Sequence, residues 1–230
     1  MASPLTLELA QARLSQVKSQ IALSARKAGR DPQEVTLLAV SKFFPVEDVG
    51  LYLALGQKDF GENYLQEAQE KALKLPEARW RFIGHLQTNK ARFVPGLFFS
   101  LDTLDSLELA AKLNKALTEK NQRLPVFIQV NISGEGSKSG LDPLELPGFL
   151  DCLTKYPALD PQGLMTMPPY DPDPEKSRPY FRRLYELREK EAPSLKGLSM
   201  GMSGDYPVAI EEGATVVRIG SALFGDRNYS

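Results

Sequence analysis

The chain has 230 residues, of which 42% are hydrophobic and 25% are charged, and this balance is typical of a globular protein. Its 28 basic and 29 acidic residues give a net charge of -1, so no overall positive field favours nucleic acid or an acidic membrane surface. A single cysteine, Cys152, excludes an intrachain disulfide, and a single histidine, His85, excludes a histidine-rich metal site. No apolar run approaches the length of a membrane span and no export signal is visible, so we expect a cytoplasmic protein.

The spacing of apolar residues predicts alternating helices and strands. Apolar residues at helical spacing predict a first helix over residues 4–28. Apolar runs predict eight strands, at 36–42, with Lys42 at the carboxyl end, and at 59–61, 80–84, 96–100, 126–131, 163–166, 197–200 and 215–220. Predicted helices lie between them, at 45–56, at 63–74, after a cap at Asp102 or Thr103, before about 155, before about 191 and around Ala209.

Eight strands separated by helical segments predict an α/β fold, a single (β/α)8 TIM barrel with an extra N-terminal helix, formed by one domain over residues 1–230. An open doubly wound sheet is the alternative. In a barrel, the carboxyl ends of all strands meet at one rim, where ligand sites are built. Polar residues that directly follow a predicted strand are therefore the candidates for a functional site.

Lys42 stands at the carboxyl end of the first and most apolar predicted strand. A lysine partly removed from water is disfavoured as a cation, so its pKa falls and more of it is a free amine that attacks a carbonyl. This placement favours Schiff-base chemistry. An ordinary solvated lysine at a strand end is the alternative interpretation.

The segments after the last two strands favour an anion site. Ser203 follows the seventh strand, and Gly220 and Ser221 follow the eighth. Loops at these positions often bind phosphate, because helix-start amides and small residues let an anion approach the backbone. Ser203 could instead be a helix N-cap, and Gly220-Ser221 a simple turn.

Arg218 precedes Gly220 by two residues, so both should face the barrel mouth. It could pair with a carboxylate such as Glu62, or it could donate a hydrogen bond to a pyridine nitrogen, which would then stay unprotonated. His85 follows the third strand and could act as a base or have a structural role. Lys138 could reach a phosphate or a ring oxygen, or it could be a solvated loop lysine.

Several blocks of the sequence resemble the YggS/PROSC family of pyridoxal 5′-phosphate (PLP) homeostasis proteins. The blocks are Ala39-Val40-Ser41-Lys42, Phe60-Gly61-Glu62-Asn63, Phe82 to Lys90, Ser137-Lys138-Ser139-Gly140, Gly163-Leu164-Met165-Thr166, Leu198 to Asp205 and Arg218-Ile219-Gly220. The resemblance implies a barrel similar to the N-terminal domain of alanine racemase, and PLP held as an aldimine on Lys42. It further implies that Arg218 faces the pyridine nitrogen, and that Ser203, Gly220 and Ser221 hold the phosphate.

By the same resemblance, Asn63, His85, Met165 and Met200 lie near the cofactor. Family members are described mostly as monomeric cofactor carriers without established catalysis, so PLP-dependent apoenzymes are possible partners. A racemase would need a second base, for which His85 or Tyr64 are candidates, and alanine racemase takes its own from an additional domain that we expect to be absent here. A cofactor-free Schiff-base aldolase is a further alternative. The proline-rich loop at 168–179 is predicted to cover the ring.

Overall fold

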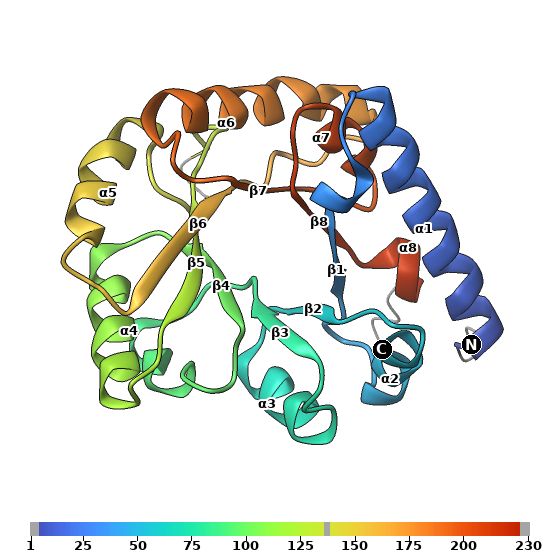
Figure 1. Ribbon diagram of the computed structural model, residues 1–230, viewed down its shortest axis with the longest axis horizontal. Coiled ribbons are helices and arrows are strands. Elements are labelled where there is room, and N and C mark those ends of the chain that lie inside the picture. Colours follow the sequence, from blue (N-terminus) through green and yellow to red (C-terminus); the bar gives the residue numbers. More distant parts are fainter. Residues whose placement is uncertain (1–4, 136–138, 226–230) are drawn as a thin grey trace.

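Eight parallel strands close into a barrel in chain order in the computed structural model, which describes residues 5–135 and 139–225 (Figure 1). Each strand pairs with its two neighbours in sequence, and the first strand closes the barrel by pairing with the eighth. The predicted (β/α)8 barrel is therefore confirmed, and the open sheet is not formed. The strands are β1 (Thr36–Val40), β2 (Asp59–Glu62), β3 (Arg79–Phe82), β4 (Ser100–Leu104), β5 (Leu124–Gln129), β6 (Leu159–Met165), β7 (Gly197–Met202) and β8 (Val216–Ile219).

Helices surround the barrel on its outer side (Figure 1). The additional N-terminal helix α1 (Leu7–Lys27) packs against α2 (Val46–Ala54), α7 (Tyr206–Glu211) and α8 (Ser221–Phe224), and the hydroxyl of Thr6 caps its first turn. Between β3 and β4 the described chain forms only the 3-10 helix η2 (Thr88–Phe93). The α-helices are α1 (Leu7–Lys27), α2 (Val46–Ala54), α3 (Leu65–Lys74), α4 (Leu107–Glu119), α5 (Leu146–Leu153), α6 (Arg178–Glu191), α7 (Tyr206–Glu211) and α8 (Ser221–Phe224). The other 3-10 helices are η1 (Pro32–Glu34), η3 (Pro143–Glu145) and η4 (Pro174–Ser177).

Two apolar clusters form the core. The larger one fills the layer between the strands and the helices, as expected for a barrel whose strands are covered on both faces. The smaller one fills the barrel interior and consists of Leu38, Val40, Ile83, Phe127, Met165 and Val216. An ion pair also lies inside the barrel, since Arg81 contacts Asp102 at 2.8 Å and its guanidinium lies 5.2 Å from the centre of the Phe127 ring.

The fourth strand differs from the prediction. It begins at Ser100, where the predicted strand over 96–100 ends, and Gly96 lies in a turn with φ of 79°. Asp102 is inside the strand because Arg81 and the Ser100 hydroxyl satisfy its carboxylate. The predicted cap at Asp102 or Thr103 is therefore wrong, and Ser106 caps α4 by accepting the amide of Leu109.

No helix in the described ranges is long and apolar enough to cross a membrane. The same residues contain no cluster of histidine, cysteine and carboxylate side chains that could hold a metal ion.

Candidate functional site

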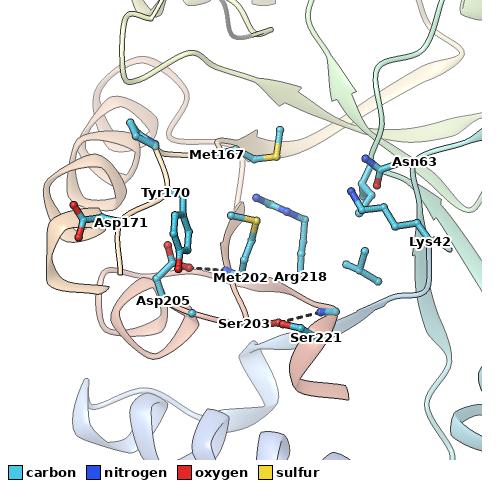
Figure 2. Close-up of a pocket in the computed structure, with 15 residues that line it drawn as sticks. Lys42, Asn63, Met167, Tyr170, Asp171, Met202, Ser203, Asp205, Arg218 and Ser221 are labelled. Atoms are coloured by element: carbon cyan, nitrogen blue, oxygen red, sulfur yellow. Dashed lines mark hydrogen bonds between the residues drawn. The ribbon is translucent and has the colours of Figure 1, made fainter. Parts of the chain in front are cut away.

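A cavity of about 490 Å³ opens at the carboxyl ends of the strands, on the side of the barrel formed by β1, β2, β7 and β8 (Figure 2). Its walls come from the ends of these strands and from the loop between β6 and α6. The lining residues are Val40, Lys42, Asn63, Ile83, Met167, Pro169, Tyr170, Asp171, Met202, Ser203, Gly204, Asp205, Arg218, Gly220 and Ser221. This is the rim at which the sequence predicted a site.

Lys42 lies in the turn after β1, and its half-buried side chain reaches into the cavity beside Asn63 (Figure 2). Asn63 follows β2 directly, so the pairing of β1 with β2 brings the two residues together. The side-chain oxygen Oδ1 of Asn63 is buried and has no hydrogen-bond partner. The Lys42 side of the cavity therefore contains an acceptor that a bound molecule could satisfy.

Arg218 lines the cavity from β8, and its guanidinium is turned toward the side of Met167, away from Lys42 (Figure 2). Its guanidinium donates hydrogen bonds to the Ser199 hydroxyl at 2.8 Å and to the carbonyl of Thr166 at 2.9 Å. Burial lowers the pKa of Arg218 to about 10, although the negative charges of Asp102 and Asp205 oppose this shift. The side chain is thus a fixed donor that stays protonated near neutral pH.

The predicted alternative partner of Arg218, Glu62, is not in contact with it. Glu62 forms an ion pair with Lys71 at 2.7 Å, and its carboxylate also accepts the Ser41 hydroxyl at 2.6 Å. Within the described ranges no carboxylate lies in ion-pair contact with Arg218. The predicted pairing of Arg218 with Glu62 is therefore wrong, because Glu62 faces the helix layer and forms its ion pair with Lys71 of α3.

Ser203 joins the two loops that were predicted to bind an anion. Its hydroxyl accepts hydrogen bonds from the amides of Gly220 at 3.2 Å and Ala222 at 3.4 Å. In the described chain, the amides of Gly204 and Ser221 make no hydrogen bond, and both residues line the cavity. This group of N–H and hydroxyl donors suits a phosphate.

Ser203 does not cap the following helix, contrary to the alternative drawn from the sequence. Asp205 occupies the position before α7, and its carboxylate accepts the Met202 amide at 2.7 Å. Asp205 thereby closes the turn from 202 to 205, and the Ser203 hydroxyl is left to bridge to the loop after β8.

Six of the nine predicted site residues line the cavity, namely Lys42, Asn63, Ser203, Arg218, Gly220 and Ser221. Met165 lies beneath it, in the interior cluster that includes the lining residues Val40 and Ile83. Met200 faces the outer layer, packed with the core between strands and helices. His85 is exposed after β3 and is absent from the lining. Lys138 lies outside the described residues.

The wall opposite Lys42 contains residues that were not predicted individually. Four residues come from the loop after β6: Met167 precedes the proline-rich loop at 168–179, and Pro169, Tyr170 and Asp171 lie within it. Tyr170 is 86% exposed, so its ring covers the edge of the cavity rather than its floor.

A family model described as "Alanine racemase, N-terminal domain" matches residues 13–228. The chain is 43% identical to the pyridoxal phosphate homeostasis protein of Aquifex aeolicus, with 94% of this chain and 98% of the relative aligned. It is 39% identical to the protein of the same name from Escherichia coli, with 94% and 96% aligned. The chain belongs to the family of pyridoxal phosphate homeostasis proteins. The predicted resemblance is confirmed.

Solved structures related to this family have the same fold. The structure of PipY from Synechococcus elongatus with PLP bound is 34% identical, with a TM-score of 0.77 over 89% of this chain and 100% of that chain. An alanine racemase of Clostridium difficile has a TM-score of 0.73 at 14% identity, and the match covers 96% of this chain and 57% of the racemase. The second likeness shows the shared barrel fold alone.

Proposed function

We propose that this protein binds pyridoxal 5′-phosphate reversibly on Lys42 and acts in PLP homeostasis. One observation carries the proposal: three kinds of group line the same cavity. They are the amine of Lys42, the buried guanidinium of Arg218, and the hydrogen-bond donors around Ser203 that suit a phosphate. The names of the relatives and the PLP bound to PipY support it. We propose further that residues 1–230 form a single PLP-binding domain.

The residues present fit this cofactor. The buried oxygen of Asn63 lacks a donor, and the amides of Gly204 and Ser221 lack acceptors in the described chain. A pyridine bearing a hydroxyl and a phosphate would supply both kinds of partner. PLP when bound supplies an aldehyde that forms an imine with an amine.

The attachment we propose is an aldimine at Lys42. The neutral amine adds to the aldehyde carbon, the carbon–oxygen double bond is replaced by a carbon–nitrogen one, and the oxygen leaves as water with the two amine hydrogens. The reaction needs no oxidant or reductant, and water reverses it. Reversibility is the property that a carrier requires.

The phosphate would be held by the Ser203 hydroxyl together with the amides of Gly204 and Ser221, while Gly220 keeps the backbone open at this point. We propose that the guanidinium of Arg218 donates to the pyridine nitrogen. Because arginine has no acceptor and keeps its proton, that nitrogen would stay unprotonated. An unprotonated ring withdraws electrons weakly, which favours carrying the cofactor over carbanion chemistry.

Asn63 is the remaining predicted residue that we place against the cofactor. Met165 supports the cavity floor through Val40 and Ile83. Given their positions, we assign no direct contact to Met200 or His85.

The alternative function is an amino-acid racemase or a related PLP enzyme. The bases suggested for it, His85 and Tyr64, are absent from the cavity lining. The relatives also carry the name of a homeostasis protein and not of an enzyme. We therefore propose a non-enzymatic role, in which a cytoplasmic monomer passes PLP to apoenzymes.

Borohydride trapping followed by peptide mass spectrometry tests the attachment. We expect one reduced pyridoxyl phosphate adduct, located on Lys42, and no turnover of L-alanine to D-alanine above that of free PLP. An adduct on another lysine would contradict the site, and racemisation well above free PLP would establish the enzyme instead.

A further inference from the structure

The two residues on either side of Lys42 are tied to one buried ammonium group. Lys71, on α3, donates to the carbonyl of Ser41 at 2.7 Å, and its side chain is 6% exposed. It also contacts Glu67 at 2.7 Å, and the same oxygen of Glu67 accepts the amide of Phe43 at 2.6 Å. The turn that carries Lys42 is therefore held from both ends by residues of α3.

Phe43 needs this support because its backbone is left-handed, with φ of 69°. For a residue other than glycine this conformation costs about 1 kcal/mol or more. The hydrogen bond from the Phe43 amide to the Glu67 carboxylate is charge-assisted and hence stronger than a neutral one. It offsets the cost of the left-handed conformation directly beside Lys42.

Glu62 completes the cluster from β2. Its side chain is fully buried, it pairs with Lys71 at 2.7 Å, and its second oxygen Oε2 has no partner. Burial raises the pKa of Glu62, while the positive charge of Lys71 opposes the shift. The pair fixes the Ser41 hydroxyl and carbonyl together, since Glu62 accepts the first and Lys71 bonds the second.

None of these three side chains lines the cavity that contains Lys42. Lys71 and Glu67 border a separate outer groove, behind the turn, together with Phe43 and Glu70. Any influence they have on the cavity must therefore pass through the turn from Ser41 to Phe43.

We propose that Lys71, with Glu62 and Glu67, forms a positioning cluster that holds the Lys42 amine in the direction required for attack on the cofactor aldehyde. This role rests on the proposed attachment of PLP to Lys42. A misplacement of about 1 Å can reduce the rate of a positioned reaction by about a hundredfold, so a released turn should slow attachment measurably.

The test compares Glu67→Ala with Glu67→Gln, which keeps an oxygen acceptor at the same place. Glu70→Ala is the matched control, because Glu70 borders the same groove from the same helix. Two quantities are measured: hydrogen exchange of the Phe43 amide without cofactor, and the rate at which PLP becomes trapped on Lys42. Thermal unfolding establishes that each variant is folded.

We expect Glu67→Ala to speed exchange of the Phe43 amide and to slow attachment, each by about tenfold, since a charge-assisted hydrogen bond is lost. Glu67→Gln should recover most of both effects, and Glu70→Ala should match the wild type. Faster exchange with an unchanged attachment rate would overturn the positioning role, as would an equal effect of Glu70→Ala.

Lys71→Met leaves Glu62 buried without its cation, so that variant is made together with Glu62→Gln. The double variant should show the same two changes as Glu67→Ala, and a wild-type attachment rate in it would overturn the role of Lys71. A wild type that traps no PLP at Lys42 would overturn the proposed function and this role with it. Normal trapping in every variant would overturn this role alone.

Discussion

The hydroxyl of Ser203 accepts the backbone amide of Gly220 at 3.2 Å, and this bond joins the loop after β7 to the loop after β8. The protein's own hydrogen bonds thus tie the two loops together. Their donors face the cavity as one group, which lowers the ordering cost of binding an anion there.

Ser203→Ala should weaken the binding of PLP by about tenfold to a hundredfold, because a hydrogen bond to a charged phosphate contributes roughly 1.5 to 3 kcal/mol. Binding of pyridoxal, which has no phosphate, should change much less. The dissociation constants of both compounds for the wild type and the variant provide the measurement. An equal loss for PLP and pyridoxal would show that Ser203 supports the fold of the site and not the phosphate.

Ser199→Ala should reduce the free energy of unfolding by about 1 to 2 kcal/mol, since it leaves a buried N–H of Arg218 without its acceptor. Ser24→Ala is the control, because Ser24 is also buried but lies in α1, where its hydroxyl accepts the neutral side-chain amide of Gln20 at 3.3 Å and not a buried guanidinium. Urea unfolding measures both. Equal stability of Ser199→Ala and the wild type would mean that the Arg218 guanidinium finds another partner.

Gly84→Ala should destabilise the protein by about 2 kcal/mol, a typical cost of overpacking. An added Cβ at Gly84 would lie 2.7 Å from the Cα of Asn63, so the backbone that presents Asn63 to the cavity would have to move. Gly148→Ala, in an exposed turn of α5 with open space around it, should instead stabilise by up to about 1 kcal/mol. Urea unfolding measures both variants. A change in the free energy of unfolding with the same sign for Gly84→Ala and Gly148→Ala would contradict these assignments.

Glu211→Gln should cost roughly 0.5 to 1 kcal/mol of unfolding free energy at neutral pH. Lys27 and Arg178 hold the pKa of Glu211 below its ordinary value of 4.5. A carboxylate with a depressed pKa contributes its stabilisation above pH 4.5 and loses it as the pH falls through the folded-state value. The difference between wild type and variant should therefore be constant from pH 7 to 5 and shrink below pH 4.5.

Glu77→Gln is the control for this experiment, since Glu77 is exposed and the described residues show no ion pair for it. A difference for Glu211→Gln that stayed constant down to pH 3 would contradict the assigned ion pairs.

The order of the strands and the residues that end them could be predicted because a buried parallel strand is a continuous apolar run. This signal located Lys42 after β1 and the loops after β7 and β8. The fourth strand was displaced because its interior residue Asp102 is charged, and only the fold brings Arg81 to it. A long-range ion pair of this kind leaves no local trace in the sequence.

Strand alternation also explains why Met165 and Met200 differ. Met165 lies in the run Gly163-Leu164-Met165 and faces the barrel interior. In the similar run Gly197-Leu198-Ser199-Met200, Ser199 is the residue in register with Met165, so Ser199 takes the inward position on β7 and Met200 faces outward. Lys71 was missed for a related reason. It lies in a helix rich in charged residues, where a lysine normally faces solvent, and its burial depends on Glu62 from a different element.

The most direct test of the central claim is the visible absorbance of the purified protein with added PLP, before and after borohydride, compared with Lys42→Ala. The account predicts an aldimine band in the wild type that reduction abolishes and fixes as a stable adduct, and no such band in the variant. A wild type without the band, or a variant that forms it equally, would contradict the attachment of PLP to Lys42.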